Sequence, residues 1–374
     1  MMDSSRRNDT QPSGAAPRED GGGWTGGSGQ RGPIPLVARY PALARVARVA
    51  LGAFPTPIVR IDIPGIPVPM WLKRDDMNAH LLAGMEFAGG NKLRALEFLL
   101  APVHDGDTVI AVGGEGSTHV LATVALARGC GARTLAIRWP HHMNPVARLV
   151  AARVASMADE VRAVRTAPGA LVSAWVAGRA PHVHVIPPGG TCPLGMLGAV
   201  NAGLELAAQI ASGEMPMPSR VILPLGTGGT AAGLSLGLTI AGLDVRVVAV
   251  RVTPRIVANR WRLARLSRGC ARLIEQLAGE RPPVVPRESV EVVHAWYGGA
   301  YGRPLPAARA AQDALEDATG LVVDDTYGAK AFAAALAIAG TPPPHGDGPT
   351  LFWKTFDPRW LGRDVDAGVA ERAQ

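Results

Sequence analysis

The sequence Gly89-Gly90-Asn91-Lys92-Leu93-Arg94 opens an apolar segment that we expect to form a helix over residues 92–101. It follows residues 71–76, which read as a strand ending in charged side chains. Two glycines let the backbone approach a bound group, and a helix N-terminus offers unpaired N–H groups and positive potential. A lysine at this end opposes the helix dipole, but a lysine that loses its proton near neutral pH can form a Schiff base with an aldehyde cofactor. Lys92 is therefore either a catalytic lysine or an exposed first-turn lysine.

The composition describes a large globular protein. The chain has 374 residues, of which 47% are hydrophobic and 18% charged, enough for two domains or one domain with a large insert. The net charge of +7 is spread along the chain, and aromatic residues make up only 5%. Basic residues are thus not interleaved with aromatic side chains on which bases could stack. We therefore expect no nucleic-acid partner and favour small anionic ligands.

Three cysteines, Cys130, Cys192 and Cys270, form no CxxC motif and no even set. This excludes a disulfide framework and favours a reducing, cytoplasmic location.

The start of the chain is rich in glycine, serine and charged residues and lacks the apolar core of a secretory signal, so we expect disorder over residues 1–45. Residues 221–243 carry no charge, but six glycines and a proline interrupt them. We therefore expect a buried strand, loop and helix there, and no membrane partner.

From residue 56 onward, short β-rich runs alternate with helical runs. Strands are expected at residues 108–112, 133–138, 160–164 and 182–186, and, in a second series, at 221–225, 245–250, 321–324 and 350–353. Continuous apolar strands favour parallel sheets that are buried on both faces. The expected fold class is α/β with two parallel-sheet domains and a cleft at their strand C-termini. The smaller domain would be residues 89–189, the larger 46–88 with 190–365, and residues 366–374 a tail.

Residues Gly226, Thr227, Gly228, Gly229 and Thr230 lie between an expected strand and an expected helix. In that geometry, backbone N–H groups and the helix N-terminus can hold a phosphate, and the threonines can add hydroxyl donors. The segment is neither GxGxxG nor a Walker A loop, which argues against an NAD-type dehydrogenase. The alternative is an ordinary glycine-rich turn.

A second glycine-rich turn leads into Ser117, Thr118 and His119. Small hydroxyl side chains at a helix start can bind a substrate carboxylate, although Ser117 could equally serve only as a helix cap. Three of the four tyrosines lie between residues 297 and 327, among them Tyr301 and Tyr327. Phenols can stack on a ligand, donate to an anion or move a proton.

These segments together resemble the fold-type II pyridoxal-phosphate enzymes with a tryptophan synthase β-like fold. The resemblance runs in order from Phe54 to Thr355 and is strongest to the D-cysteine desulfhydrase and 1-aminocyclopropane-1-carboxylate deaminase branch. It implies pyridoxal 5'-phosphate as cofactor, bound by the larger domain. The implied catalytic residues are Lys92, Ser117, Tyr301 and Tyr327; the implied cofactor-binding residues are Lys92, Asn91, Gly226, Thr227, Gly228, Gly229, Thr230 and Thr355; and the implied substrate-binding residues are Ser117, Thr118, His119, Tyr301 and Tyr327.

The resemblance implies a homodimeric lyase or deaminase that removes the α-proton of a small amino acid. Loss of a β-substituent would end in a 2-oxo acid and ammonia. A hydroxyl group at Thr355, instead of a carboxylate, would leave the pyridine nitrogen mostly unprotonated and favour elimination or proton transfer over transamination. The alternatives are β- or γ-replacement, racemisation in a specialised pathway, and a non-catalytic ligand-binding relative.

Three positions depart from the family pattern. Thr118 stands where the family has an asparagine, Gly328 where the deaminase branch has an acidic residue, and 354–357 reads Lys-Thr-Phe-Asp in place of His-Thr-Gly-Gly. We expect the last change to make one pocket wall bulkier and charged, and the three together to alter the substrate or reaction.

No metal site is expected. The pairs His141-His142 and His182-x-His184 lack a Cys, Asp or Glu set at ligand spacing, so we interpret them as surface histidines. Asp324 and Asp325 are consecutive at a strand end and would point to opposite faces, which argues against a shared proton.

Overall fold

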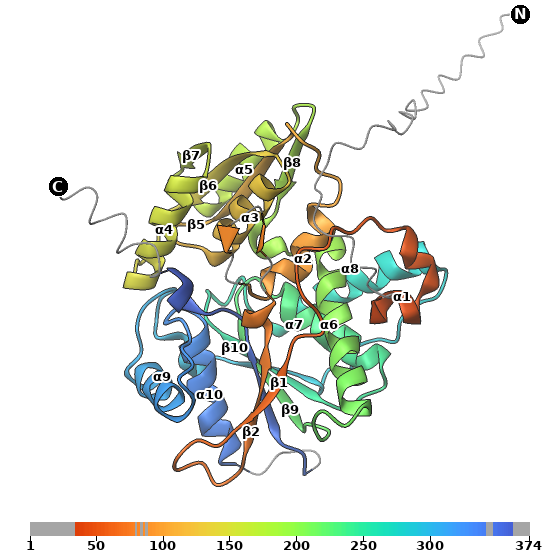
Figure 1. The fold of residues 1–374 in the computed structure, drawn as a ribbon, viewed down its shortest axis with the longest axis vertical. Coiled ribbons are helices and arrows are strands. Elements are labelled where there is room, and N and C mark those ends of the chain that lie inside the picture. The colour runs from red at the N-terminus through yellow and green to blue at the C-terminus, as the bar shows by residue number, and fades with distance from the viewer. Residues whose placement is uncertain (1–33, 79–80, 83–84, 87–88, 342–346, 362–374) are drawn as a thin grey trace, which may run out of the picture.

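The computed structural model describes residues 34–78, 81–82, 85–86, 89–341 and 347–361. Figure 1 shows a lobe built on a four-stranded sheet above a lobe built on a six-stranded sheet. The chain starts in the six-stranded sheet, passes through the four-stranded one and returns, so the large lobe contains both early and late strands.

The six-stranded sheet has the order β1-β2-β12-β9-β10-β11. All neighbours pair in parallel except β1, which pairs antiparallel with β2 at the edge. The strands are β1 (Ile58–Ile61), β2 (Met70–Arg74), β9 (Arg220–Leu225), β10 (Arg246–Arg251), β11 (Val290–Val293) and β12 (Thr350–Lys354).

Alternate residues of the central strands enter two different cores, as a side-chain period of two requires. In β9, Val221 and Leu223 pack in the core with α6 (Pro193–Ala211), α7 (Gly229–Ile240) and α8 (Arg260–Ala278). Ile222 faces the opposite core, with α9 (Pro306–Thr319) and α10 (Gly328–Ala339) (Figure 1). The expectation of a parallel sheet buried on both faces is confirmed.

The four-stranded sheet is fully parallel, with the order β7-β6-β5-β8. Helices α3 and α4 pack with Ala111 and Ala136, whereas α5 packs with Ile110 and Ile137, so this sheet too is covered on both faces. Its elements are β5 (Thr108–Gly114), α3 (Thr118–Gly129), β6 (Arg133–Trp139), α4 (Pro145–Met157), β7 (Glu160–Ala163), α5 (Ala167–Ala177) and β8 (Val183–Ile186).

Helix α2 (Lys92–Leu99) lies between the lobes and packs tightly on α6. A Cβ atom at Gly198 of α6 would lie 1.9 Å from the carbonyl oxygen of Arg94, so only glycine permits this approach. The short elements are β3 (Leu81–Leu82), β4 (Met85–Glu86) and the 3₁₀ turns η1 (Pro41–Arg45), η2 (Asp75–Met77), η3 (Pro188–Gly190), η4 (Ala295–Tyr297) and η5 (Pro358–Leu361).

Two predictions about local structure are wrong. Residues 34–45 are not part of a disordered tail: α1 (Pro35–Arg39) and η1 bury Leu36, Tyr40 and Leu43 in the large core. Residues 321–324 do not form a strand. The carboxylate of Asp324 accepts hydrogen bonds from backbone N–H groups of the following turn, where a strand would bond to a neighbouring strand. Residues 1–33 and 366–374 lie outside the described residues, and the remaining domain boundaries stay predictions.

The uncharged stretch 221–243 forms β9, a loop and α7, as expected. Within the described part of the chain, one helix, α6, has the length and apolar composition to cross a membrane. Because 72% of its apolar window is buried inside the protein, its composition is explained by its place in the core.

Candidate active site

A cavity of about 330 Å³ lies where the C-terminal ends of both sheets meet. Its wall includes Gly113 and Trp139 at the ends of β5 and β6, Leu225 at the end of β9, and Thr355 just after β12. Ligands of open parallel sheets bind at this edge. The expected cleft at the strand C-termini is therefore present, and every predicted site residue lines it, including those from both lobes.

The segment before Lys92 is held from both sides. Asn78 donates its side-chain amide to the carbonyl of Gly90 at 3.1 Å and accepts the N–H of Gly90 at 2.7 Å. The backbone N–H of Asn91 donates to the carbonyl of Thr355 at 3.1 Å. Gly90 has φ of 138°, and a Cβ atom there would lie 2.8 Å from that carbonyl, so this position requires glycine.

Lys92 is the first residue of α2 and the one lysine or arginine among the described residues that line the cavity. Burial lowers the pKa of its amine to about 8. At pH 7 about a tenth of such amines are neutral, far more than for an ordinary lysine. The interpretation of Lys92 as an exposed first-turn lysine is wrong.

The residues 226–230 form the turn between β9 and α7, with Gly228 in the left-handed region at φ 98°. The carbonyl oxygens of Gly226 and Thr227 accept hydrogen bonds from Thr253 and Arg262, at 3.0 and 3.1 Å. Because these bonds engage the carbonyls, the N–H groups at the start of α7 are the groups left to meet an anion. The side-chain amide of Asn91 donates to the Thr230 hydroxyl at 3.0 Å and links this turn to Lys92.

Ser117 precedes α3 on the other side of the cavity. It is buried, and its side chain makes no capping hydrogen bond to the helix, so its hydroxyl is not used as a cap. Thr118 and His119 follow it in the first turn of α3. Burial and the nearby Lys92 lower the pKa of His119 to about 3, and its ring nitrogens have no hydrogen-bond partner among the described residues. His119 is therefore neutral.

Tyr301 and Tyr327 share a hydrogen bond between their hydroxyl groups, and their rings meet edge to face with centroids 5.7 Å apart. Burial raises the pKa of Tyr327 to about 12 and raises that of Tyr301 well above its usual value. Asp324 holds the turn before Tyr327 by accepting its N–H at 2.8 Å. The pair stays protonated at neutral pH and can donate a proton but not take one.

His141 was missed by sequence reasoning. It is half-buried, lines the cavity and meets the ring of Tyr301 edge to face at 4.5 Å, so its interpretation as a surface histidine is wrong. Its Nδ1 lies 2.7 Å from the carbonyl of His142, which can only accept, so Nδ1 carries a proton. A position just past the end of β6 was the available signal, because such positions face the cleft.

The same loop joins the two lobes. Asn144 donates its side-chain amide to the hydroxyl of Thr326 at 2.7 Å and to the carbonyl of Gly302 at 3.4 Å. A Cβ atom at Gly302 would lie 2.7 Å from the carbonyl of His142, so this contact too depends on glycine. These contacts fix the loop that carries Tyr301 against the small lobe.

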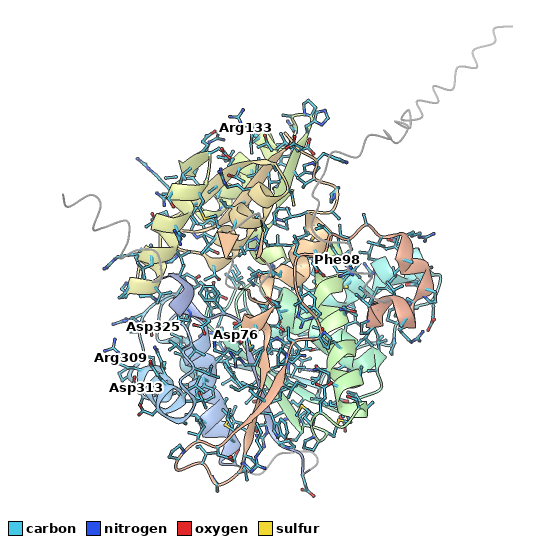
Figure 2. All side chains as sticks on the ribbon, in the orientation of Figure 1. Asp76, Phe98, Arg133, Arg309, Asp313 and Asp325 are labelled. Atoms are coloured by element: carbon cyan, nitrogen blue, oxygen red, sulfur yellow. The ribbon has the colours of Figure 1, made fainter. Side chains whose placement is uncertain are left out.

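The expected charged wall at residues 354–357 is only half right. Phe356 lines the cavity and makes this wall bulky. Lys354 points away from it: its amine lies 2.9 Å from a carboxylate oxygen of Asp76, which lies between the two sheets (Figure 2), and 3.3 Å from Asp357. The positive charge of Lys354 is paired inside the protein and does not face the cavity, because burying an unpaired charged amine costs free energy.

Gly328 also has a physical explanation. A Cβ atom at this position would lie 2.8 Å from the Cβ of Val323 and 3.1 Å from a carboxylate oxygen of Asp324. No acidic side chain fits here with the present backbone.

A family model described as "Pyridoxal-phosphate dependent enzyme" matches residues 49–347. The chain belongs to this family. It is 37% identical over 333 residues to nocardicin C-9' epimerase of Nocardia uniformis subsp. tsuyamanensis, covering 86% of this chain and 95% of the relative. It is 29% identical to D-cysteine desulfhydrase of Salmonella paratyphi A, covering 84% and 94%.

A solved structure of a 1-aminocyclopropane-1-carboxylate deaminase homologue superimposes with a TM-score of 0.70 at 26% identity, covering 92% of this chain and 99% of the other. The fold is thus fold-type II, and the protein is a pyridoxal-phosphate-dependent enzyme.

The residues of the cavity fit this cofactor. The amine of Lys92 has a neutral fraction near pH 7, so it can react with an aldehyde. The carbonyls of Gly226 and Thr227 accept other hydrogen bonds, so the N–H groups of the turn 226–230 can bind a phosphate. Among the described residues, no group of three or more His, Cys, Asp or Glu is arranged to hold a metal ion. His182 and His184 instead contact Asp107, at 3.2 and 2.8 Å.

Proposed function

We propose that the enzyme removes the α-proton of a small amino acid and eliminates its β-substituent, giving a 2-oxo acid and ammonia. The observation that carries this proposal is the placement in one cavity of Lys92, whose pKa lies near 8, and of a tyrosine pair that stays protonated. One group can take a proton at neutral pH and the other can give one.

The cofactor would be held by its phosphate at residues 226–230 and by its aldehyde at Lys92, with Asn91 and Thr355 beside it. When bound, it supplies an electron sink that stabilises negative charge at the α-carbon. Thr355 offers a hydroxyl and no carboxylate, and its backbone is fixed by the bond to Asn91, which supports its assignment beside the pyridine nitrogen.

Lys92 is the proposed base. Its side-chain amine, in the neutral form, would accept the α-proton of the substrate. Its low pKa has burial as its cause, so the cavity keeps a useful neutral fraction without a partner charge.

Tyr301 and Tyr327 are the proposed acid. Their shared hydrogen bond lets the hydroxyl that donates to the leaving group be resupplied by the other. His141 and Asn144 hold the loop of Tyr301 in place and thus act as positioning residues.

The proposed carboxylate site of the substrate is the N-terminus of α3, with Ser117 and Thr118, and His119 beneath it. These are neutral donors, which is consistent with a small amino acid. The lack of room for an acidic side chain at Gly328 argues against opening of a cyclopropane ring, which in the resembling family uses an acid there.

Epimerisation at the α-carbon is the second candidate. It is favoured by the 37% identity to nocardicin C-9' epimerase over nearly the whole of both chains. In this case the proton taken by Lys92 from one face would be replaced from the other face by Ser117 or a tyrosine. The same groups serve both reactions; they differ in which atom receives the returned proton.

The test is a reaction in D₂O of the holoenzyme with a panel of D- and L-amino acids that includes D-cysteine and β-chloroalanine. Elimination predicts 2-oxo acid from at least one β-substituted substrate. Deuterium at the α-carbon with inversion, and no 2-oxo acid, would establish epimerisation instead. Absence of both products and of α-proton exchange would refute the proposal. A cytoplasmic location and a homodimer remain predictions, the latter measurable by sedimentation.

A further inference from the structure

Helix α8 carries a row of arginines on one face. Arg268 and Arg272 are four residues apart, so their side chains project in similar directions, and Arg260 lies about two turns before Arg268. All three are exposed and line a second cavity of about 250 Å³, which shares no lining residue with the active-site cavity. Arg281 and Arg287, in the segment after α8, also line it.

The floor of this groove is apolar. Leu236 of α7, Leu263 and Ala271 of α8, and Val285 and Val290 beyond α8 form it. Trp261 and Val284 stand at its rim and are 79% and 70% exposed, unusual for side chains of this size. An apolar floor beside exposed arginines is the complement of a molecule with an apolar body and a negative charge.

The arginines of this groove outnumber the carboxylates that pair with them among the described residues. Arg268 and Arg272 make no ion pair with any described residue, and Arg281 reaches Glu275 only at 3.9 Å. Glu288 and Glu291 lie near Arg260 and Arg287 at one end, but Glu291 pairs with Arg246 at 3.6 Å. Like charges four residues apart on a helix repel, so Arg268 and Arg272 are arranged at a cost that a bound anion would offset.

We propose that this groove binds an amphipathic carboxylate, whose apolar body lies on the floor between α7 and α8 and whose carboxylate lies between Arg268 and Arg272. Guanidinium groups bind carboxylates with paired hydrogen bonds, and two of them beside an apolar slot define both the charge and the length of the ligand. The cavity volume is below the range of drug-sized sites, which limits the apolar body to a short chain or a single ring.

A second copy of the chain is a less favourable occupant of this groove than a carboxylate. A two-fold interface here would bring the same arginine row of two copies together, and like charges would face each other. The ligand would touch α7 and α8, and α8 also supports the phosphate turn: Arg262 bonds to the Thr227 carbonyl at 3.1 Å, and Leu263 lies against Gly228.

The test is calorimetric titration of the holoenzyme with sodium octanoate, with octanamide as the uncharged ligand of the same length. Octanoate is expected to bind saturably at one site per chain, more weakly at high salt, and octanamide at least tenfold more weakly. Equal binding of the two, or no saturable binding of octanoate, overturns the proposal.

Variants locate the site. Arg268→Gln with Arg272→Gln is expected to weaken octanoate binding at least tenfold, and Ala264→Phe, which fills the groove, to abolish it. Arg265→Gln is the matched control, because Arg265 is an exposed arginine of α8 that does not line the groove. Unchanged binding in the first two variants overturns the assignment. A change of sedimenting mass in the double variant, without octanoate binding to the parent, would identify the groove as an interface between copies instead.

Discussion

Lys73 is buried and Lys92 is half-buried at the start of α2, and desolvation lowers the pKa of each. Their surroundings differ. The Lys73 amine lies 2.7 Å from Glu205 and 2.7 Å from the carbonyl of Thr56, and it also bonds to Gln209. Lys92 lies in the cavity, and burial alone accounts for its low pKa.

The cluster around Lys73 is balanced. Arg94 bonds to Asp75 at 2.7 Å and to Glu205 at 2.8 Å, so two cations meet two carboxylates. Arg94 is two residues after Lys92 on α2, so this cluster fixes the helix that carries the proposed catalytic lysine. We therefore interpret the paired Lys73 as structural, and we propose that Lys92, which has no ion-pair partner among the described residues, is available for chemistry.

Replacing Lys92 gives the largest expected effect. Lys92→Ala should reduce turnover on the order of 10⁴-fold or more, because both the covalent attachment and the base are lost. The visible absorbance of the bound cofactor should change as well, whereas the melting temperature of the cofactor-free protein should not fall. Lys92→Arg, which keeps the charge, should be equally inactive. Substantial activity in either variant would contradict the assignment.

Breaking the paired cluster should act on stability. Glu205→Gln leaves two buried cations with one carboxylate and should lower the free energy of unfolding by about 3–5 kcal/mol, measured by urea denaturation. Glu316→Gln, on an exposed side chain of α9 outside this cluster, is the control and should change it by less than about 1 kcal/mol.

The same carboxylate should make the fold acid-sensitive. Its arginine and lysine partners lower the pKa of Glu205 to about 2 from 4.5. The folded state therefore binds fewer protons than the unfolded state between these values, and the contribution present above pH 4.5 is lost as the pH falls toward 2. Glu205→Gln should lack this part of the pH dependence; an identical profile would refute it.

Tyr301 tests whether pairing always marks a structural role, because it is paired with Tyr327 and yet lines the cavity. Tyr301→Phe should lower kcat about 10²-fold with little change in KM or melting temperature, as loss of a general acid does. Loss of stability with unchanged kcat in the folded fraction would make the tyrosine structural, like Lys73.

The smallest effect is on the cofactor-free protein. If the pKa of Lys92 is about 8, the rate of covalent attachment of pyridoxal phosphate should rise about tenfold between pH 7 and pH 9 and level off above that. An ordinary lysine would give a rise of about a hundredfold without a plateau in this range. Stopped-flow absorbance distinguishes the two.

Local patterns predicted most of the fold. The alternation of apolar strands and helices located both parallel sheets, and glycine-rich turns marked the points where strands lead into helices at the cleft. The prediction failed at residues 321–324, where an apolar run packs in the core without a sheet neighbour, and at residues 34–45, where Leu36 and Tyr40 are buried only because α6 and α8 provide a surface for them.

The residues that line the candidate site could be named from the sequence, because glycine, lysine and hydroxyl side chains at helix starts carry their chemistry in local sequence. Tertiary structure alone decided the rest: that Lys92 has no hydrogen-bond partner among the described residues whereas Lys73 has three, that Lys354 turns away from the cavity, that His141 packs on Tyr301 and that Gly328 has no room for an acid. Each of these depends on contacts between residues far apart in the chain. Burial and pairing belong to the packed molecule, and a sequence motif does not contain them.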